Sequence, residues 1–251
     1  MKQKFTSKYV REAFDKLGIT RHYGGIPATE RLIGLCNIKP DQHVLEIGCG
    51  SGYTACLLAK EYNARVTALD IGQKLLERTR KRAIEQGVGN KVETVQADAQ
   101  ELDFPTAIFD AAITESVLVL CDSRRASSGV YRTLKPKGVF GVNELTLLKS
   151  PPEELVALFS DMGIRLLWED EWRAVFREAG FSDVSSNVYQ INMWEDAISR
   201  FQVDGIGTFL SAVVSGFLDT NIRNALTKDA IREWRRFPQS VGYGLYVCRK
   251  T

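Results

Sequence analysis

The chain has 251 residues, with 33 Lys and Arg against 31 Asp and Glu, which gives a formal net charge of +2. So small a charge argues against nucleic acid as a partner. No run of about 18 apolar residues occurs, and residues 1–5 lack the apolar segment of a signal peptide, so we expect a cytoplasmic protein with no membrane partner. The length fits one enlarged α/β domain.

Five cysteines are scattered along the chain without a C-x-x-C pair: Cys36, Cys49, Cys56, Cys121 and Cys248. The chain has only two histidines, so neither a zinc site nor any other metal site is expected. The simpler interpretation is a set of reduced thiols in the core.

The N-terminal part predicts two helices around a turn. Val10, Phe14 and Leu17 have helical spacing within residues 7–17, and Gly18 supplies a stop. Residues 22–27 form a turn-rich joint that contains His22 and Tyr23. A second helix is expected over residues 28–36.

A glycine-rich turn follows the first predicted strand, residues 43–47. Gly48, Gly50 and Gly52 stand at alternate positions, and residues 54–61 are expected to form a helix. Glycine tolerates positive φ and lets the backbone approach a ligand closely, while the helix start offers free N–H groups. This pattern of strand, tight turn and helix indicates a ligand-binding loop.

Asp70 lies twenty residues after Gly50, at the end of the next strand-like run, residues 65–69. An acidic residue in this place can accept hydrogen bonds from both ribose hydroxyls of a nucleoside. It could also cap the helix that begins near Gly72. The two roles are compatible, so the spacing predicts a nucleoside-cofactor site.

Two residues argue against a dinucleotide. Tyr53 stands where the dinucleotide fingerprint has its third glycine, and Glu46 lies just before the loop. A carboxylate would repel a diphosphate but could pair with an ammonium or a sulfonium. The chain also lacks the G-x-x-x-x-G-K-[ST] pattern of nucleoside triphosphate sites.

The segment Glu46–Gly52 resembles the first motif of the class I S-adenosylmethionine-dependent methyltransferases. The resemblance covers roughly residues 24 to 144, and four of the family's motifs occur in order: residues 46–52, 96–99, 109–115 and 134–138. Lys137 departs from the family, which often has glycine there. The resemblance implies S-adenosylmethionine as the cofactor. The residues that it implies for cofactor binding are Glu46, Gly48, Cys49, Gly50, Gly52, Asp70, Ile71, Asp98, Ala99 and Glu115.

The central segment alternates short apolar runs with helices. Strands are expected at 43–47, 65–70, 91–96, 109–114 and 138–144, with helices at 54–61, 73–86 and 123–134. Such alternation predicts parallel strands joined by right-handed crossovers. The expected fold is α/β, a doubly wound, Rossmann-like sheet. By resemblance it has seven strands, mostly parallel, with an antiparallel last strand at residues 242–248. The candidate residues then gather at the carboxyl ends of the strands.

The regular alternation of short apolar runs and helices stops after Glu144. We expect an N-terminal helical segment at 1–36, the cofactor-binding core at 37–149, a helical cap with the sixth strand at 150–237, and a C-terminal strand at 238–251. A helix is expected at 153–162, a strand at 183–190 and a long helical stretch at 193–237. The cap would form the acceptor pocket, with Tyr23, Glu115 and Trp172 facing it, although Trp172 could instead belong to the core of the cap.

These features predict a methyltransferase that acts on a small molecule by in-line displacement. Glu115, Tyr23 and His22 are the candidate catalytic residues, because any of them could remove a proton from the acceptor. Tyr23 could form a mobile joint over the cofactor, or simply pack in a turn. The alternatives are a cyclopropane-type or other enzyme that uses the same cofactor, a binding protein without turnover and, more remotely, an arsenite methyltransferase. The acceptor and the oligomeric state are left open.

Overall fold

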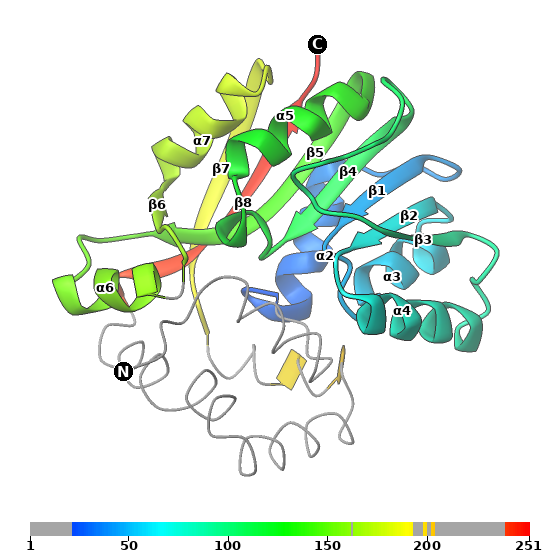
Figure 1. Ribbon diagram of the computed structural model, residues 1–251, viewed down its shortest axis with the longest axis horizontal. Coiled ribbons are helices and arrows are strands. Elements are labelled where there is room, and N and C mark those ends of the chain that lie inside the picture. The colour runs from blue at the N-terminus through cyan, green and yellow to red at the C-terminus, as the bar shows by residue number, and fades with distance from the viewer. Residues whose placement is uncertain (1–21, 162, 193–197, 200–201, 204–238) are drawn as a thin grey trace.

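The computed structural model describes residues 22–161, 163–192, 198–199, 202–203 and 239–251 (Figure 1). The helix expected at 7–17 and nearly all of the helical stretch expected at 193–237 lie outside these residues. Within the described ranges, no helix is long and apolar enough to cross a membrane.

A mixed β-sheet forms the centre of the molecule. The strand order is β3-β2-β1-β4-β5-β8-β7, and the two-residue β6 pairs with β5 beside this path. Neighbours are parallel except for β8, which is antiparallel to both β5 and β7. The predicted sheet, with its antiparallel last strand, is confirmed. Its strands are β1 (His43–Ile47), β2 (Arg65–Asp70), β3 (Val92–Gln96), β4 (Phe109–Glu115), β5 (Leu134–Leu147), β6 (Leu167–Trp168), β7 (Asp183–Gln190) and β8 (Val241–Arg249).

Helices cover both faces of the sheet (Figure 1). Side chains of consecutive residues in a strand point to opposite faces. In β5, Phe140 packs on Phe176 of α7, whereas the next residue, Gly141, lies directly against Cys36 of α2. The sheet therefore separates α2 from α7. The helices are α2 (Gly25–Cys36), α3 (Tyr53–Glu61), α4 (Gln73–Glu85), the 3₁₀ turn η1 (Leu118–Leu120), α5 (Ser123–Thr133), α6 (Glu153–Asp161) and α7 (Glu169–Glu178).

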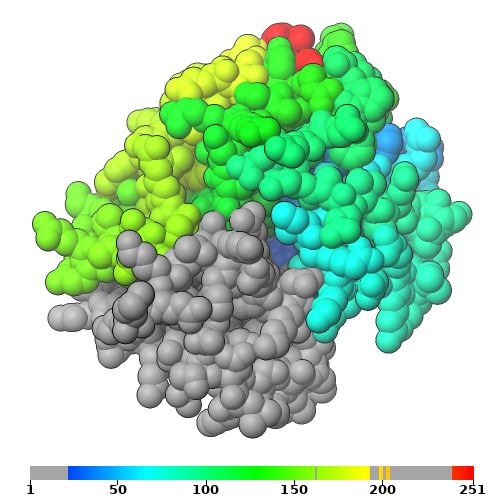
Figure 2. Space-filling view, in the orientation of Figure 1, coloured from blue at the N-terminus to red at the C-terminus, as the bar shows by residue number. Residues whose placement is uncertain are grey.

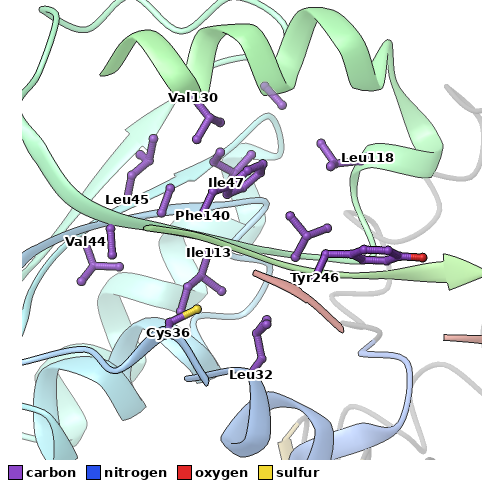
Figure 3. Packing of buried hydrophobic residues seen from close by; sticks show 14 of the residues in the cluster. Leu32, Cys36, Val44, Leu45, Ile47, Ile113, Leu118, Val130, Phe140 and Tyr246 are labelled. Atoms are coloured by element: carbon purple, nitrogen blue, oxygen red, sulfur yellow. The ribbon is translucent and has the colours of Figure 1, made fainter. Parts of the chain in front are cut away.

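The core is continuous across the sheet. Figure 3 shows Leu32 and Cys36 of α2 on one side of the strands and Val130 of α5 on the other. The inner strands are buried on both faces, which explains why their sequences read as apolar runs and do not alternate.

The chain order creates a topological switch point beside β1. From β1 the chain moves outward to β2 and β3, then returns to the other side of β1 and continues into β4. Ligands of open α/β sheets bind beyond the carboxyl ends of the strands at such a switch point. Glu46, Asp70 and Glu115 lie at or near the carboxyl ends of β1, β2 and β4.

Trp172 does not face an acceptor pocket, and this part of the prediction is wrong. Its side chain is 1% exposed, stacks on Phe176 and lies beside Tyr246, and its indole N–H donates to the carbonyl oxygen of Leu145 at 2.8 Å. Helix α7 is amphipathic, with Trp172, Val175 and Phe176 on its buried side. Trp172 and its aromatic neighbours Phe176 and Tyr246 therefore belong to the layer between α7 and the sheet.

The Trp172→Ala variant should be less stable by about 3–5 kcal/mol, the usual cost of emptying a buried aromatic site. Urea unfolding followed by circular dichroism measures this loss. A stable variant that had lost only its response to a methyl acceptor would instead place Trp172 in the pocket.

Candidate active site

The glycine loop is fixed by the protein backbone. Gly48, Gly50 and Gly52 have φ values of 72°, 55° and 78°. The N–H groups of Gly48 and Cys49 both donate to the carbonyl oxygen of Leu69 at the end of β2, at 2.7 and 2.9 Å. The loop is thereby tied to the strand that ends in the predicted ribose-binding acid.

Neighbouring side chains explain two of these glycines. A Cβ atom at Gly48 would clash with the side chain of Val117, and one at Gly52 would lie 2.6 Å from Cγ2 and 2.9 Å from Cα of Thr79. From the sequence, the lack of side chains at these glycines was explained by the close approach of a ligand. The protein's own packing already requires them at Gly48 and Gly52.

Asp70 joins the loop to the start of α4. Its Oδ2 accepts the N–H of Gly50 at 2.9 Å and its Oδ1 accepts that of Gly72 at 2.8 Å. The residue that caps α4 is Gly72 itself, so Asp70 is not the N-cap. Each carboxylate oxygen can accept more than one hydrogen bond, so contact with a ribose remains compatible with this geometry and stays a prediction.

Glu46 is a buried carboxyl group that lacks a full set of partners. It is 4% exposed and is hydrogen-bonded to the N–H of Ala55, but its Oε2 has no hydrogen-bond partner among the described residues. Burial, together with the negative charges of Glu115 and Asp70, raises the pKa of Glu46 well above its ordinary value. A cationic ligand would relieve this burial cost.

Glu115, in contrast, is fully surrounded by donors. Burial raises its pKa, but the neighbouring His22 and the hydrogen bonds outweigh burial, so the pKa lies below its ordinary value. Glu115 is therefore a poor proton acceptor. The donors come from three elements and the N-terminal joint: Thr29 of α2 at 2.8 Å, Thr54 of α3 at 3.0 Å, Asn143 of β5 at 3.3 Å and His22 Nδ1 at 3.2 Å.

The joint at residues 22–24 is held at the same place. Tyr23 is 5% exposed, its N–H donates to Ser116 Oγ at 3.4 Å and its carbonyl oxygen accepts from Asn143 Nδ2 at 2.8 Å. A buried Tyr23 with two backbone hydrogen bonds agrees with the alternative of a packed turn, and a mobile joint over the cofactor stays a prediction. In Figure 2 a small dark-blue patch from the start of the described chain is visible next to cyan segments.

The predicted adenine-binding turn lies beside Asp70, because the N–H of Ala97 donates to the carbonyl oxygen of Asp70. The carboxylate of Asp98 accepts hydrogen bonds from the backbone and side chain of Gln100. Ala99 is buried, whereas Ile71 is 47% exposed. The turn is in place, but contacts of these residues with an adenine remain predictions.

Cys49 is a buried loop residue, and no thiol cluster accompanies it. Burial, with the charges of Glu46 and Asp70, raises the pKa of its thiol well above the ordinary value, and the Sγ atom lies 3.7 Å from Thr79 Oγ1. Burial also raises the pKa of the Cys56 thiol to about 11. Within the described ranges no group of three or more His, Cys, Asp and Glu side chains could hold a metal ion.

Four functional candidates escaped the sequence interpretation: Thr29, Thr54, Asn143 and Glu144. The first two bind Glu115 from helices that are distant in sequence. Asn143 and Glu144 are fully buried in β5. A signal was present, because two polar residues stand side by side within the otherwise apolar run of residues 139–145.

Comparison with known proteins identifies the family. A family model for methyltransferase domains matches residues 44–138. The 27-O-demethylrifamycin SV methyltransferase of Amycolatopsis mediterranei is 31% identical over 233 residues, which cover 88% of this chain and 82% of that protein. The chain belongs to the class I S-adenosylmethionine-dependent methyltransferases. The resemblance seen in the sequence is confirmed.

Solved structures of this fold also superpose on this methyltransferase. The [4+2]-cyclase SpnF matches with a TM-score of 0.80 at 19% identity and covers 98% of this chain and 96% of its own. A phosphoethanolamine N-methyltransferase of Haemonchus contortus, solved with phosphomonomethylethanolamine and S-adenosylhomocysteine, matches with a TM-score of 0.75 at 17% identity. That match covers 97% of this chain and 57% of the other. At these identities the likeness shows the fold.

The site fits the family's cofactor. S-adenosylmethionine carries an ammonium group and a sulfonium group, and the buried Oε2 of Glu46 lacks a donor among the described residues. Glu46 would hold the positive end, the loop from Gly48 to Gly52 would lie along the ligand, and Asp70 would face the ribose.

We expect cofactor binding to release a proton from Glu46. Burial and the nearby negative charges raise the pKa of Glu46 well above its ordinary value, and a bound cation would lower that pKa. Titration calorimetry with S-adenosylhomocysteine near pH 7, in buffers of different ionisation enthalpy, measures the release. Glu46→Gln should abolish it and weaken binding by about 1.5–3 kcal/mol. Equal heats in all buffers, or proton uptake, would contradict this assignment.

Proposed function

We propose that this methyltransferase transfers the methyl group of S-adenosylmethionine to a hydroxyl-bearing small molecule, and that His22 removes the proton of the acceptor. The observation that carries the proposal is the contact of 3.2 Å between His22 Nδ1 and the carboxylate of Glu115, at the carboxyl end of β4. A base is needed for a hydroxyl acceptor because a neutral alcohol is a weak nucleophile.

Hydrogen bonding fixes the tautomer of His22. Glu115 is a carboxylate and can only accept. Thr29 Oγ1 lies 3.4 Å from His22 Nδ1, but its single hydrogen is directed to Glu115 Oε2 at 2.8 Å. Towards Nδ1 the threonine oxygen can therefore only accept as well. Two acceptors around Nδ1 favour the neutral ring with its proton on this atom, and in the proposed mechanism Nε2 is then the basic nitrogen.

The rest of the site would orient the reactants. The cofactor supplies a methyl group activated by its bond to a positively charged sulfur, so this chain has to align the acceptor and exclude water. Asn143 contributes a buried Oδ1 without a hydrogen-bond donor among the described residues. Its amide orientation is set because Nδ2 faces two oxygens, those of Tyr23 and Glu115. A hydroxyl acceptor could donate to this oxygen.

The acceptor itself remains the open part of the proposal. We propose that residues 150–237 contribute the pocket, although many of them lie outside the described residues. The name of the rifamycin relative indicates O-methylation, and that of the phosphoethanolamine relative indicates N-methylation. We prefer a hydroxyl acceptor because it needs a base, and His22 with Glu115 would supply the base and the group that orients it.

The test is release of S-adenosylhomocysteine with a panel of phenols, macrocyclic alcohols and sterols, and with amines as a comparison. His22→Gln should lower kcat by about 100-fold or more, the usual contribution of a general base, and leave the affinity for S-adenosylhomocysteine unchanged within about threefold. His43→Gln is the matched control. The His43 ring lies at the other end of β1, against Thr67 and Phe109, so this variant should keep full turnover.

Two outcomes would contradict the proposal. If His22→Gln retains its kcat with a hydroxyl acceptor, His22 is not the base. If no acceptor yields S-adenosylhomocysteine although the cofactor binds, the chain is a cofactor-binding protein without turnover, or an enzyme that uses the same cofactor for another reaction.

A further inference from the structure

Glu144 is a buried carboxyl group for which the proposed reaction has no use. It lies near the carboxyl end of β5 and is 0% exposed. Its Oε1 accepts two consecutive backbone N–H groups, those of Val117 at 2.7 Å and Leu118 at 2.5 Å. Its Oε2 has no hydrogen-bond partner among the described residues. One oxygen atom therefore holds the chain segment that follows β4.

That segment touches the cofactor loop. Val117 is the residue whose side chain fills the space beside Gly48, where any Cβ atom would clash with it. The preceding residue, Ser116, has a φ of 64°, a conformation that residues other than glycine seldom adopt. Its N–H donates to the carbonyl oxygen of Asn143 at 2.8 Å. Residues 116–118 are thus hydrogen-bonded to Asn143 and Glu144 of β5 on one side, and Val117 contacts the glycine loop on the other.

We propose that Glu144 is a positioning residue for the cofactor loop: by binding the N–H groups of Val117 and Leu118 it holds Val117 against Gly48 and so sets the loop for S-adenosylmethionine. This role concerns the cofactor half of the site. It does not depend on the acceptor or on His22.

The protonated form of Glu144 is sufficient to bind the N–H groups of Val117 and Leu118. Burial raises the pKa of Glu144 to about 8, although its backbone hydrogen bonds lower it in part. Among the described residues, Tyr246 of β8 lies on the same side of the sheet and is affected by the charges of Glu144, Glu169 and Arg173, whereas Glu115 of β4 lies across the sheet. A protonated carboxyl group accepts both N–H groups through its carbonyl oxygen. A glutamine reproduces this acceptor in the same place.

Three variants separate the position of the acceptor from its charge. Glu144→Gln keeps the acceptor, Glu144→Asp keeps the acid but withdraws it from the two N–H groups, and Glu144→Leu removes it. Titration calorimetry with S-adenosylhomocysteine at pH 7 should give an affinity within about threefold of wild type for Gln, and a loss of about tenfold or more for Asp and Leu. Circular dichroism establishes that each variant is folded.

Val117→Ala tests the link to the loop if a Glu144 variant fails to fold. It leaves Glu144 and its hydrogen bonds in place but empties the contact with Gly48, so the affinity should fall by about fivefold. Wild-type affinity in Val117→Ala, or in the Asp and Leu variants, would overturn the proposal. A loss with Glu144→Gln as large as that with Leu would also overturn it, because the charge would then matter more than the position.

The pH dependence of stability gives a readout without any ligand. The folded protein binds the Glu144 proton more tightly than the unfolded chain, so the stabilisation by this group is present at low pH. It is lost as the pH rises from about 4.5 to about 8. The urea midpoint of wild type should therefore fall relative to that of Glu144→Gln over this window. A constant difference between the two midpoints would contradict the protonated state assigned to Glu144.

Discussion

The site depends on one buried carboxylate, Glu115, at the end of β4. Its donors come from α2, α3, β5 and the N-terminal joint, so a single side chain fixes four parts of the chain relative to one another. Removing one partner of such a group leaves a buried charge or an unsatisfied donor, at a cost of several kcal/mol. In the proposed mechanism, the same hydrogen bonds that hold the fold here also give His22 its tautomer. Stability and chemistry therefore share one interaction.

Three further buried carboxyl groups lie at the same edge of the sheet, and each deals with burial differently. Asp70 receives two backbone N–H groups, one on each oxygen. Oε1 of Glu144 receives two, and in both Glu144 and Glu46 the other oxygen, Oε2, has no hydrogen-bond partner among the described residues. Burial raises the pKa of Glu46 well above its ordinary value and that of Glu144 to about 8, whereas His22 and the hydrogen bonds hold the pKa of Glu115 below its ordinary value. Burial and hydrogen bonding therefore shift the pKa values of Glu46, Glu144 and Glu115 in different directions, which the number of acidic residues does not reveal.

The sequence predicted the fold well because strand ends, glycine spacing and apolar runs are local signals. The strands β1 and β2 were predicted with their observed bounds, and Asp70 was placed correctly beside the loop. Contacts across the chain could not be predicted in this way. Thr29 and Glu115 are 86 residues apart, and no pattern indicates that they meet. Trp172 was assigned to the pocket because its aromatic character fits a pocket as well as a core, and only the packing of α7 on the sheet decides between them.

The tautomer of His22 is the most direct test of the central claim that Glu115 organises the site for proton removal. A two-bond ¹H–¹⁵N spectrum of the protein labelled at its two histidines reports which ring nitrogen carries the proton, and His43→Gln assigns the signals. Above the pH at which the ring loses its second proton, His22 should show a protonated Nδ1 and an unprotonated Nε2. In Glu115→Gln this preference should weaken. A His22 ring protonated on Nε2 in the wild-type protein, or a spectrum unchanged in Glu115→Gln, would contradict the role assigned to Glu115.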